Sequence, residues 1–180
     1  MSDTFFERPI INSPYAYPGK HWELDEQGQP TGRLVDERRR ATFFTPIPKP
    51  KKRKGSAKQG DLTFGEDGTT SRERQQHLDT INELRGLVAD WRKLPSGQWM
   101  VTPETARLLH HWRHHEFSRE RPFFCQLEAA ETAIWLTEVA PNLPAGKRLL
   151  AYLEAANEAA NPGLRRMALK LATGAGKTTV

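Results

Sequence analysis

A proline-rich, basic stretch is the feature of this sequence that most restricts what the chain can fold into. In TPIPKPKKRKGSAKQG, proline occupies positions 46, 48 and 50. Proline fixes its own φ and has no backbone N–H to donate, so these positions exclude a paired central strand and favour extended polyproline geometry. The lysines and arginine that follow repel one another, and the glycines after them are typical of a flexible linker. We therefore expect residues 46–70 to be a poorly ordered basic linker that separates an extended leader, residues 1–45, from the rest of the chain.

Charge is concentrated in the same part of the chain. The whole sequence has a formal net charge of +5, whereas residues 33–58 contain ten basic and two acidic side chains, a local balance of +8. Such a block indicates a polyanionic partner or a solvated segment, and it says little about fold. The run KPKKRK at 49–54 therefore has two interpretations: non-specific contact with DNA phosphates, or a solvated linker.

The leader contains one hairpin signal and no helical periodicity. The segment HWELDEQGQPTGRLV has two short, partly alternating runs around GQPTG. This pattern predicts a hairpin in which Trp22 and Leu24 face Leu34 or Val35.

Residues 71–117 carry the periodicity of helices. Between residues 71 and 94 the apolar side chains recur at helical spacing until PSG at 95–97 interrupts the pattern. This face consists of Leu78, Ile81, Leu84, Leu87, Val88 and Trp91. In VTPETARLLHHWRHHEF, Thr102 is a predicted N-cap and Pro103 a predicted first helical residue. The buried stripe of this second helix consists of Leu108, Leu109 and Trp112.

Two further helices are predicted before the C-terminal glycine-rich stretch. Pro122 and Pro141 bound the first of them, and residues 145–160 form the second, which the turn NPG ends. The predicted core face of the first consists of Phe123, Leu127, Ala130 and Ile134. The apolar segment RRMALKLAT, 165–173, is then predicted to be a buried strand.

The strand leads into GAGKTTV, and this order of elements indicates a phosphate-binding loop. Glycines adopt backbone angles that other residues avoid, so the turn can point its N–H groups at an anion, and the following helix N-terminus adds its dipole. Lys177 would contact the β- and γ-phosphates, and the Thr178 hydroxyl would bind Mg²⁺. Leu171 stands where the strict pattern has glycine. The alternative is a glycine-rich turn with a lysine that faces solvent.

These residues resemble a known family. ATGAGKT at 172–178 resembles motif I of superfamily 2 DEAD/DEAH-box helicases. RPFFCQLEAA at 121–130 resembles the adenine-reading glutamine segment seen in the Res subunit of type III restriction enzymes. The leader, including PIINSPYAYPGK and FFTPIPKPKKRK, also looks like the start of such proteins.

The resemblance implies a site for ATP and Mg²⁺. The Gln126 amide would meet adenine through its donor and acceptor groups, and the Phe124 ring would cover the base. The alternative is that Gln126 is a surface residue of an amphipathic helix. Lys177 is the implied catalytic residue, and Thr178 is the implied metal ligand. The implied nucleotide-binding residues are Phe124, Gln126, Thr173, Gly174, Ala175, Gly176, Lys177, Thr178 and Thr179.

The fold expected from this resemblance is an α/β parent with a truncated RecA-like P-loop domain. Within this chain we expect mostly helix, one strand before the loop, a helical segment at 71–117, and the incomplete start of the helicase domain at 118–180. The expected function is the N-terminal part of an ATP-dependent DNA helicase or translocase subunit of a type III-like restriction system. DNA and a methyltransferase or specificity subunit are the implied partners. No acidic Mg²⁺ motif, arginine finger or nuclease centre is visible, so this piece alone is not expected to hydrolyse ATP.

Two other function classes stay open. One is a different P-loop class, such as a nucleotide kinase or an AAA-type ATPase. The other is a non-catalytic nucleic-acid-binding module that acts through the basic linker.

The remaining chemistry-bearing residues favour plainer roles. His110/His114 and His111/His115 are i, i+4 pairs, but a solvated or anion-facing helix flank is favoured over a metal site. Cys125 is the single cysteine, which excludes a disulfide framework and favours a packed thiol in a reducing compartment. No secretory signal and no apolar run of roughly 18 residues is present. We therefore expect a cytoplasmic protein without a membrane partner.

Overall fold

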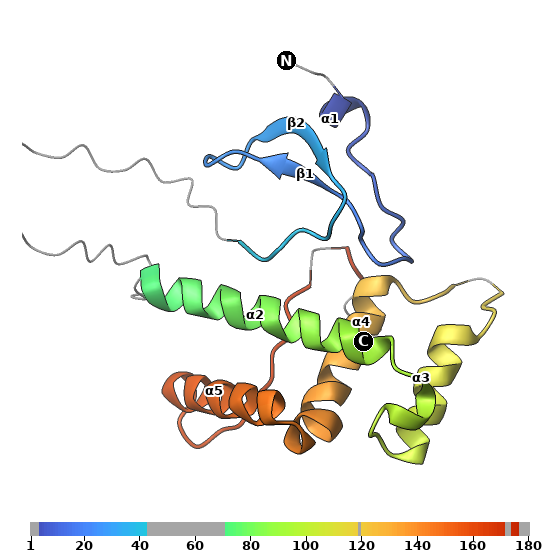
Figure 1. The fold of residues 1–180 in the computed structure, drawn as a ribbon, viewed down its shortest axis with the longest axis vertical. Helices are drawn as coiled ribbons and strands as arrows, with labels where there is room; N and C mark the ends of the chain where they lie inside the picture. The colour runs from blue at the N-terminus through green and yellow to red at the C-terminus, as the bar shows by residue number, and fades with distance from the viewer. Residues whose placement is uncertain (1–3, 43–70, 119, 172–173, 177–180) are drawn as a thin grey trace, which may run out of the picture. The chain divides into compact units, whose positions relative to one another are not determined.

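The computed structural model describes residues 4–42, 71–118, 120–171 and 174–176 (Figure 1). The predicted linker, 46–70, lies wholly outside these residues. Two units are distinguished. The hairpin unit consists of Met1–Asn12 and Pro18–Glu83, and the helical unit consists of Ser13–Tyr17 and Leu84–Val180. Within the described residues no helix is both long enough and apolar enough to cross a bilayer.

The hairpin unit contains a short helix, α1 (Thr4–Glu7), and two antiparallel strands, β1 (His21–Leu24) and β2 (Pro30–Val35). The predicted hairpin is confirmed, and Trp22 lies opposite Leu34. The prediction for Leu24 is wrong, since its partner is Pro30. The reason is a bulge in β2, where the register shifts and Gly32 takes a φ of 83°. Extra residues on one strand displace every pair beyond the bulge.

The predicted first long helix is α2 (Ser71–Arg92), and a 3₁₀ turn, η1 (Ser96–Gln98), follows it. The predicted cap of α3 (Pro103–His114) is confirmed, because the Thr102 side chain accepts a hydrogen bond from the Thr105 N–H. Leu109 is fully buried, as predicted, but Leu108 is 49 % exposed, so the prediction that Leu108 is buried is wrong. Only one side of α3 faces the core of the helical unit, so Leu109 points into the core while its neighbour Leu108 points to solvent.

A single apolar stripe is the wrong description of the next helical stretch. It consists of α4 (Phe124–Ile134), a π turn η2 (Trp135–Val139) and a 3₁₀ turn η3 (Ala140–Asn142). The predicted core residues are only half-buried, whereas Gln126, Ala129, Glu131, Trp135, Leu136, Val139 and Ala140 are buried. The π turn rotates the buried face, and the two polar residues are buried because each has a polar partner.

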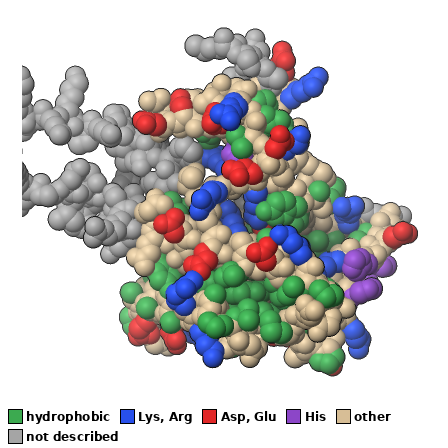
Figure 2. All heavy atoms as spheres, in the orientation of Figure 1, with side chains coloured by type: hydrophobic (Ala, Val, Ile, Leu, Met, Phe, Trp, Pro, Cys, Tyr) green, Lys and Arg blue, Asp and Glu red, His purple; other side chains and the backbone are tan. Residues whose placement is uncertain are grey.

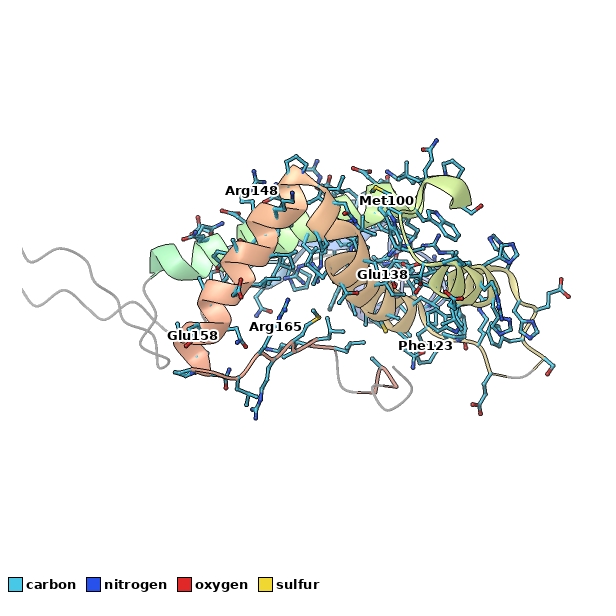
Figure 3. The ribbon with its side chains drawn as sticks, turned by 90° about the horizontal axis from the view of Figure 1, so that it is seen from below. Met100, Phe123, Glu138, Arg148, Glu158 and Arg165 are labelled. Carbon is cyan, nitrogen blue, oxygen red and sulfur yellow. The ribbon has the colours of Figure 1, made fainter. Side chains whose placement is uncertain are left out.

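Glu138 in this π turn caps the neighbouring helix. Its Oε2 accepts a hydrogen bond from the Thr102 N–H at 2.6 Å, and its Oε1 accepts one from the Thr105 hydroxyl at 2.6 Å. A carboxylate at a helix N-terminus satisfies otherwise unpaired N–H groups and suits the helix dipole. Figure 3 shows Glu138 beside the segment that carries Met100. The Met100 backbone has a φ of 55°, which is uncommon for a residue other than glycine.

Helix α5 (Pro144–Ala160) packs closely on the end of the preceding stretch. Gly146 is buried, and a Cβ at this position would lie within van der Waals overlap of the Ala140 backbone. Ala140 is also part of the buried core of the helical unit. This core consists of Val88, Trp91, Trp99, Leu109, Trp135, Leu136, Val139, Ala140 and Leu149.

The strand predicted at 165–173 is absent from the described residues. Residues 164–171 have no regular secondary structure, and Leu164, Met167 and Leu169 are exposed. An apolar segment becomes a strand only when a neighbouring strand pairs its N–H and C=O groups, and the described residues offer none here. The described fold is therefore largely helical with one small antiparallel sheet.

Candidate nucleotide-binding site

The N-terminus of α4 forms the first part of the site. Pro122 precedes the helix, and Phe123 has an extended backbone. The Phe123 N–H donates a hydrogen bond of 2.6 Å to Oε1 of Gln126. A glutamine at the third helical position that reaches back in this way satisfies a free N–H and fixes where the helix begins. Figure 3 shows Phe123 at this end of α4.

The other end of the Gln126 amide contacts the glycine-rich loop. Its Nε2 donates a hydrogen bond of 2.8 Å to the Gly176 carbonyl, and Gln126 is only 8 % exposed. The interpretation of Gln126 as a surface residue is therefore wrong. Two segments 50 residues apart in sequence meet through one amide. An amide has two N–H groups and two carbonyl lone pairs, so these two hydrogen bonds use one of each.

The described part of the loop, 174–176, contains two glycines with left-handed backbone angles. Gly174 and Gly176 have φ values of 78° and 65°. Among the described residues, apart from its chain neighbours, no heavy atom lies within 4 Å of the place where a Cβ would stand on Gly174. Ala175 lies between them and is half-buried. The predicted residues Thr173, Lys177, Thr178 and Thr179 lie outside the described residues.

Aromatic side chains surround the start of α4. The Phe124 N–H donates to the Pro14 carbonyl at 2.8 Å, which ties the Ser13–Tyr17 segment to the helix. The Tyr17 ring meets Phe124 edge-on at 5.5 Å, and the Arg92 guanidinium lies 5.1 Å from the Phe124 ring centre. One face of Phe124 is thus occupied by a cation within the protein.

Tyr15 and Arg121 belong to the same cluster and were not found from the sequence. Tyr15 packs against Phe123 with ring centres 5.3 Å apart, and the Arg121 guanidinium lies 4.4 Å from the centre of the Tyr15 ring. The only signal was SPYAYP, in which aromatics alternate between prolines. Nothing in that pattern specifies a partner more than 100 residues away along the chain.

A buried carboxylate holds Arg92 in place beside Phe124. Glu131 is 3 % exposed and lies between two arginines. Its Oε2 accepts a hydrogen bond of 2.6 Å from Arg92 Nε, and its Oε1 accepts one of 2.8 Å from Arg113 Nε. The Arg113 guanidinium also lies 4.6 Å from the Trp99 ring. Three charged side chains therefore lie inside the unit, and the attraction between Glu131 and the two arginines offsets the cost of removing them from water.

The predicted alternatives for metal binding find little support in the part of the chain that the structure describes. It contains no group of three or more His, Cys, Asp or Glu side chains placed to hold a metal ion. The rings of His110 and His114 are 4.7 Å apart, and those of His111 and His115 are 4.4 Å apart. All four are exposed, and Figure 2 shows histidines gathered at one edge of the surface. Cys125 is a half-buried free thiol.

Comparison with known proteins assigns no family to this chain. No protein-family model matches the sequence, and neither a curated protein nor a solved structure matches it.

Proposed function

We propose that this chain carries the nucleotide-binding part of an ATP-dependent DNA helicase or translocase subunit similar to the Res subunit of type III restriction enzymes. The observation that carries the proposal is the hydrogen bond between Gln126 and the Gly176 carbonyl. A phosphate-binding loop and an adenine-reading amide act on one molecule only if they lie side by side.

In this proposal the loop at 174–176 binds the phosphates with its N–H groups. Both glycines have positive φ, and no described residue outside the immediate neighbours of Gly174 occupies the place of its missing Cβ, where an anion would approach. Lys177 contacts the terminal phosphates, while Thr178 contributes a hydroxyl ligand to Mg²⁺, which neutralises phosphate charge. Gln126 contacts adenine with the N–H and lone pair that its protein partners leave over.

The residues that we assign supply binding rather than hydrolysis. Hydrolysis also needs an acidic group that positions water and an arginine at the terminal phosphate. The assigned loop and amide include neither, so we assign hydrolysis to the longer helicase subunit.

Nucleotide affinity measured with ATP and adenosine tests this assignment. Lys177→Ala removes a charge-assisted phosphate contact and should weaken ATP roughly tenfold to a hundredfold, with adenosine affinity unchanged. Gln126→Glu keeps the acceptor for the Phe123 N–H but faces the Gly176 carbonyl with an oxygen, so it should weaken both ligands. Gln75→Ala, an exposed glutamine of α2, is the control. Normal ATP binding by Lys177→Ala would contradict the proposal.

Activity of the longer subunit distinguishes helicases from other P-loop classes. We expect ATP hydrolysis that DNA stimulates and that Lys177→Ala abolishes. Hydrolysis without DNA stimulation would favour a nucleotide kinase or an AAA-type ATPase. DNA binding that survives every loop variant but disappears when 49–58 is deleted would favour the non-catalytic binding module.

A further inference from the structure

The chain leaves α5 through a turn that the end of the helix holds. The Leu164 N–H donates to the Asn161 carbonyl at 3.1 Å. Gly163 has a φ of 70°, and its N–H lies 3.3 Å from each carboxylate oxygen of Glu158. Figure 3 shows Glu158 at the end of α5 and Arg165 on the segment that follows. The last turn of α5 therefore fixes the start of the stretch that leads to the glycine-rich loop.

The Asn157 side chain binds the segment just after this turn. Its Nδ2 donates a hydrogen bond of 2.9 Å to the Leu164 carbonyl, and its Oδ1 accepts one of 3.0 Å from the Arg166 N–H. These two backbone groups flank Arg165, and they are the pair that a residue of a neighbouring parallel strand would bond. The Asn157 amide thus supplies one step of the pairing that no strand of the described residues gives to 164–171.

Asn157 serves this segment rather than its own helix. It stands in the alanine-rich run EAANEAA, 154–160. Asparagine is a weaker helix former than alanine, because its side chain competes for backbone hydrogen bonds. Here the half-buried side chain makes such bonds to backbone outside α5. Its contribution is therefore the connection between the end of α5 and residues 164–166.

The glycine-rich loop has a second anchor at the far end of the same stretch. Gln126, which belongs to α4, donates from Nε2 to the Gly176 carbonyl at 2.8 Å. Between the two anchors, the described residues 167–171 and 174–175 form neither helix nor strand. Two side-chain amides from two helices thus hold the ends of a stretch whose described part has no regular secondary structure.

We infer that Asn157 is a positioning residue for the glycine-rich loop, since it fixes the entry of the stretch on α5 while Gln126 fixes Gly176 on α4. An anion-binding turn binds best when its N–H groups are arranged before the ligand arrives, because ordering them on binding costs affinity. The inference rests on the proposed function for the identity of the ligand. It adds a residue that acts on phosphate binding through the backbone and not by touching the nucleotide.

Nuclear magnetic resonance relaxation of the full chain tests the anchor without any nucleotide. Asn157→Ala removes both hydrogen bonds and places a better helix former in α5, so we expect the helical core to stay intact. Backbone order parameters should fall from about 0.85 to below about 0.6 at 164–166 and at 174–176. The Gln126 side-chain amide protons, which report the contact with Gly176, should exchange faster with water.

Nucleotide affinity measures the consequence for binding. Asn157→Ala should weaken ATP about threefold to tenfold, whereas adenosine, which has no phosphate, should change by less than about twofold. A general loss of structure would weaken both ligands, so the split between them distinguishes positioning from a structural role.

Asn142→Ala is the matched control. Asn142 also donates from Nδ2 to a backbone carbonyl, that of Glu138, at 2.9 Å. Its removal should leave the order parameters at 174–176 unchanged and should change ATP affinity by less than about twofold.

Order parameters at 174–176 that are unchanged in Asn157→Ala would overturn the inference, whether or not those at 164–166 fall. Unchanged ATP affinity in Asn157→Ala would overturn it as well. If ATP fails to bind the unmodified chain while the order parameters at 174–176 fall as expected, the proposed function is wrong and Asn157 stands as the anchor of the loop. The two failures are therefore separate results.

Discussion

The helical unit and the hairpin unit differ in what holds them together. The helical unit encloses a continuous core in which Leu109 and Val139 are fully buried and Trp135 is 1 % exposed. In the described part of the hairpin unit no side chain is buried. Its order comes from side chains that hydrogen-bond to the backbone. Asn12 binds both the N–H and the carbonyl of Lys20, and Asp25 accepts from two N–H groups in the turn.

The two units therefore position functional side chains in different ways. A core fixes side chains by packing, so the helical unit can hold buried charges such as Glu131 at defined distances. An isolated two-stranded hairpin is only marginally stable in water, and it keeps its surfaces accessible. The proposed ATP site depends on the first property.

The largest expected effect comes from breaking the buried charges of the helical unit. Glu131→Gln leaves Arg92 and Arg113 without a counter-charge in a buried place, and we expect a loss of about 3–5 kcal/mol in the free energy of unfolding. Denaturant titration followed by circular dichroism measures it. Glu154→Gln, an exposed glutamate of α5, should change stability by less than about 0.5 kcal/mol. A loss below about 1 kcal/mol in Glu131→Gln would mean that the two arginines reach water.

A pair of glycines sharpens the contrast between packed and open positions. Gly146→Ala drives a methyl group into the Ala140 backbone and should cost about 1–3 kcal/mol of unfolding free energy. Gly86 lies in α2, and its added Cβ would have no heavy atom of another described element within 4 Å, so Gly86→Ala should stabilise by about 0.5–1 kcal/mol. Thermal and denaturant unfolding compare the two variants. A Gly146→Ala variant as stable as the unmodified chain, or more stable, would contradict the close approach of α5.

The smallest effect is expected in the hairpin unit, at the clasp between Asn82 and Ala41. Asn82 Oδ1 accepts from the Ala41 N–H at 2.8 Å, and Nδ2 donates to the Ala41 carbonyl at 3.1 Å. Asn82→Ala should cost about 1 kcal/mol of local stability, so amide exchange at Ala41 should accelerate roughly fivefold. Gln75→Ala on the same helix is the control, and an unchanged exchange rate at Ala41 would refute the clasp.

The sequence predicted those parts of the fold that depend on neighbouring residues. The hairpin, the four long helices and the Thr102 cap follow from local spacing and capping chemistry. The Leu24 register was wrong because the bulge depends on Gly32 adopting a positive φ, and the pattern does not reveal that. The segment 165–173 had a strand's composition, but composition supplies no pairing partner.

The candidate site was predictable from sequence in its loop, in Gln126 and in Phe124, but not in the residues that surround them. The glycine-rich loop and Gln126 stand out in the sequence, and the structure brings Gln126 to Gly176. The aromatic surroundings were missed because Tyr15 and Tyr17 come from a segment far away in sequence. The burial of Glu131 was missed for the same reason, since its two arginines lie on other helices.

The π turn at Trp135–Val139 has a consequence for how this chain tolerates changes in length. Each residue of a regular helix turns the next side chain by about 100°, and a π turn absorbs one residue more than a regular turn. We expect that deleting this extra residue would restore regular helical geometry and leave the flanking helices in their places. The same deletion would swing the Glu138 carboxylate away from Thr102 and leave α3 without its cap. The extra residue of the π turn therefore orients Glu138 so that it can cap α3, and the length of the α4 stretch is thereby linked to the place where α3 begins.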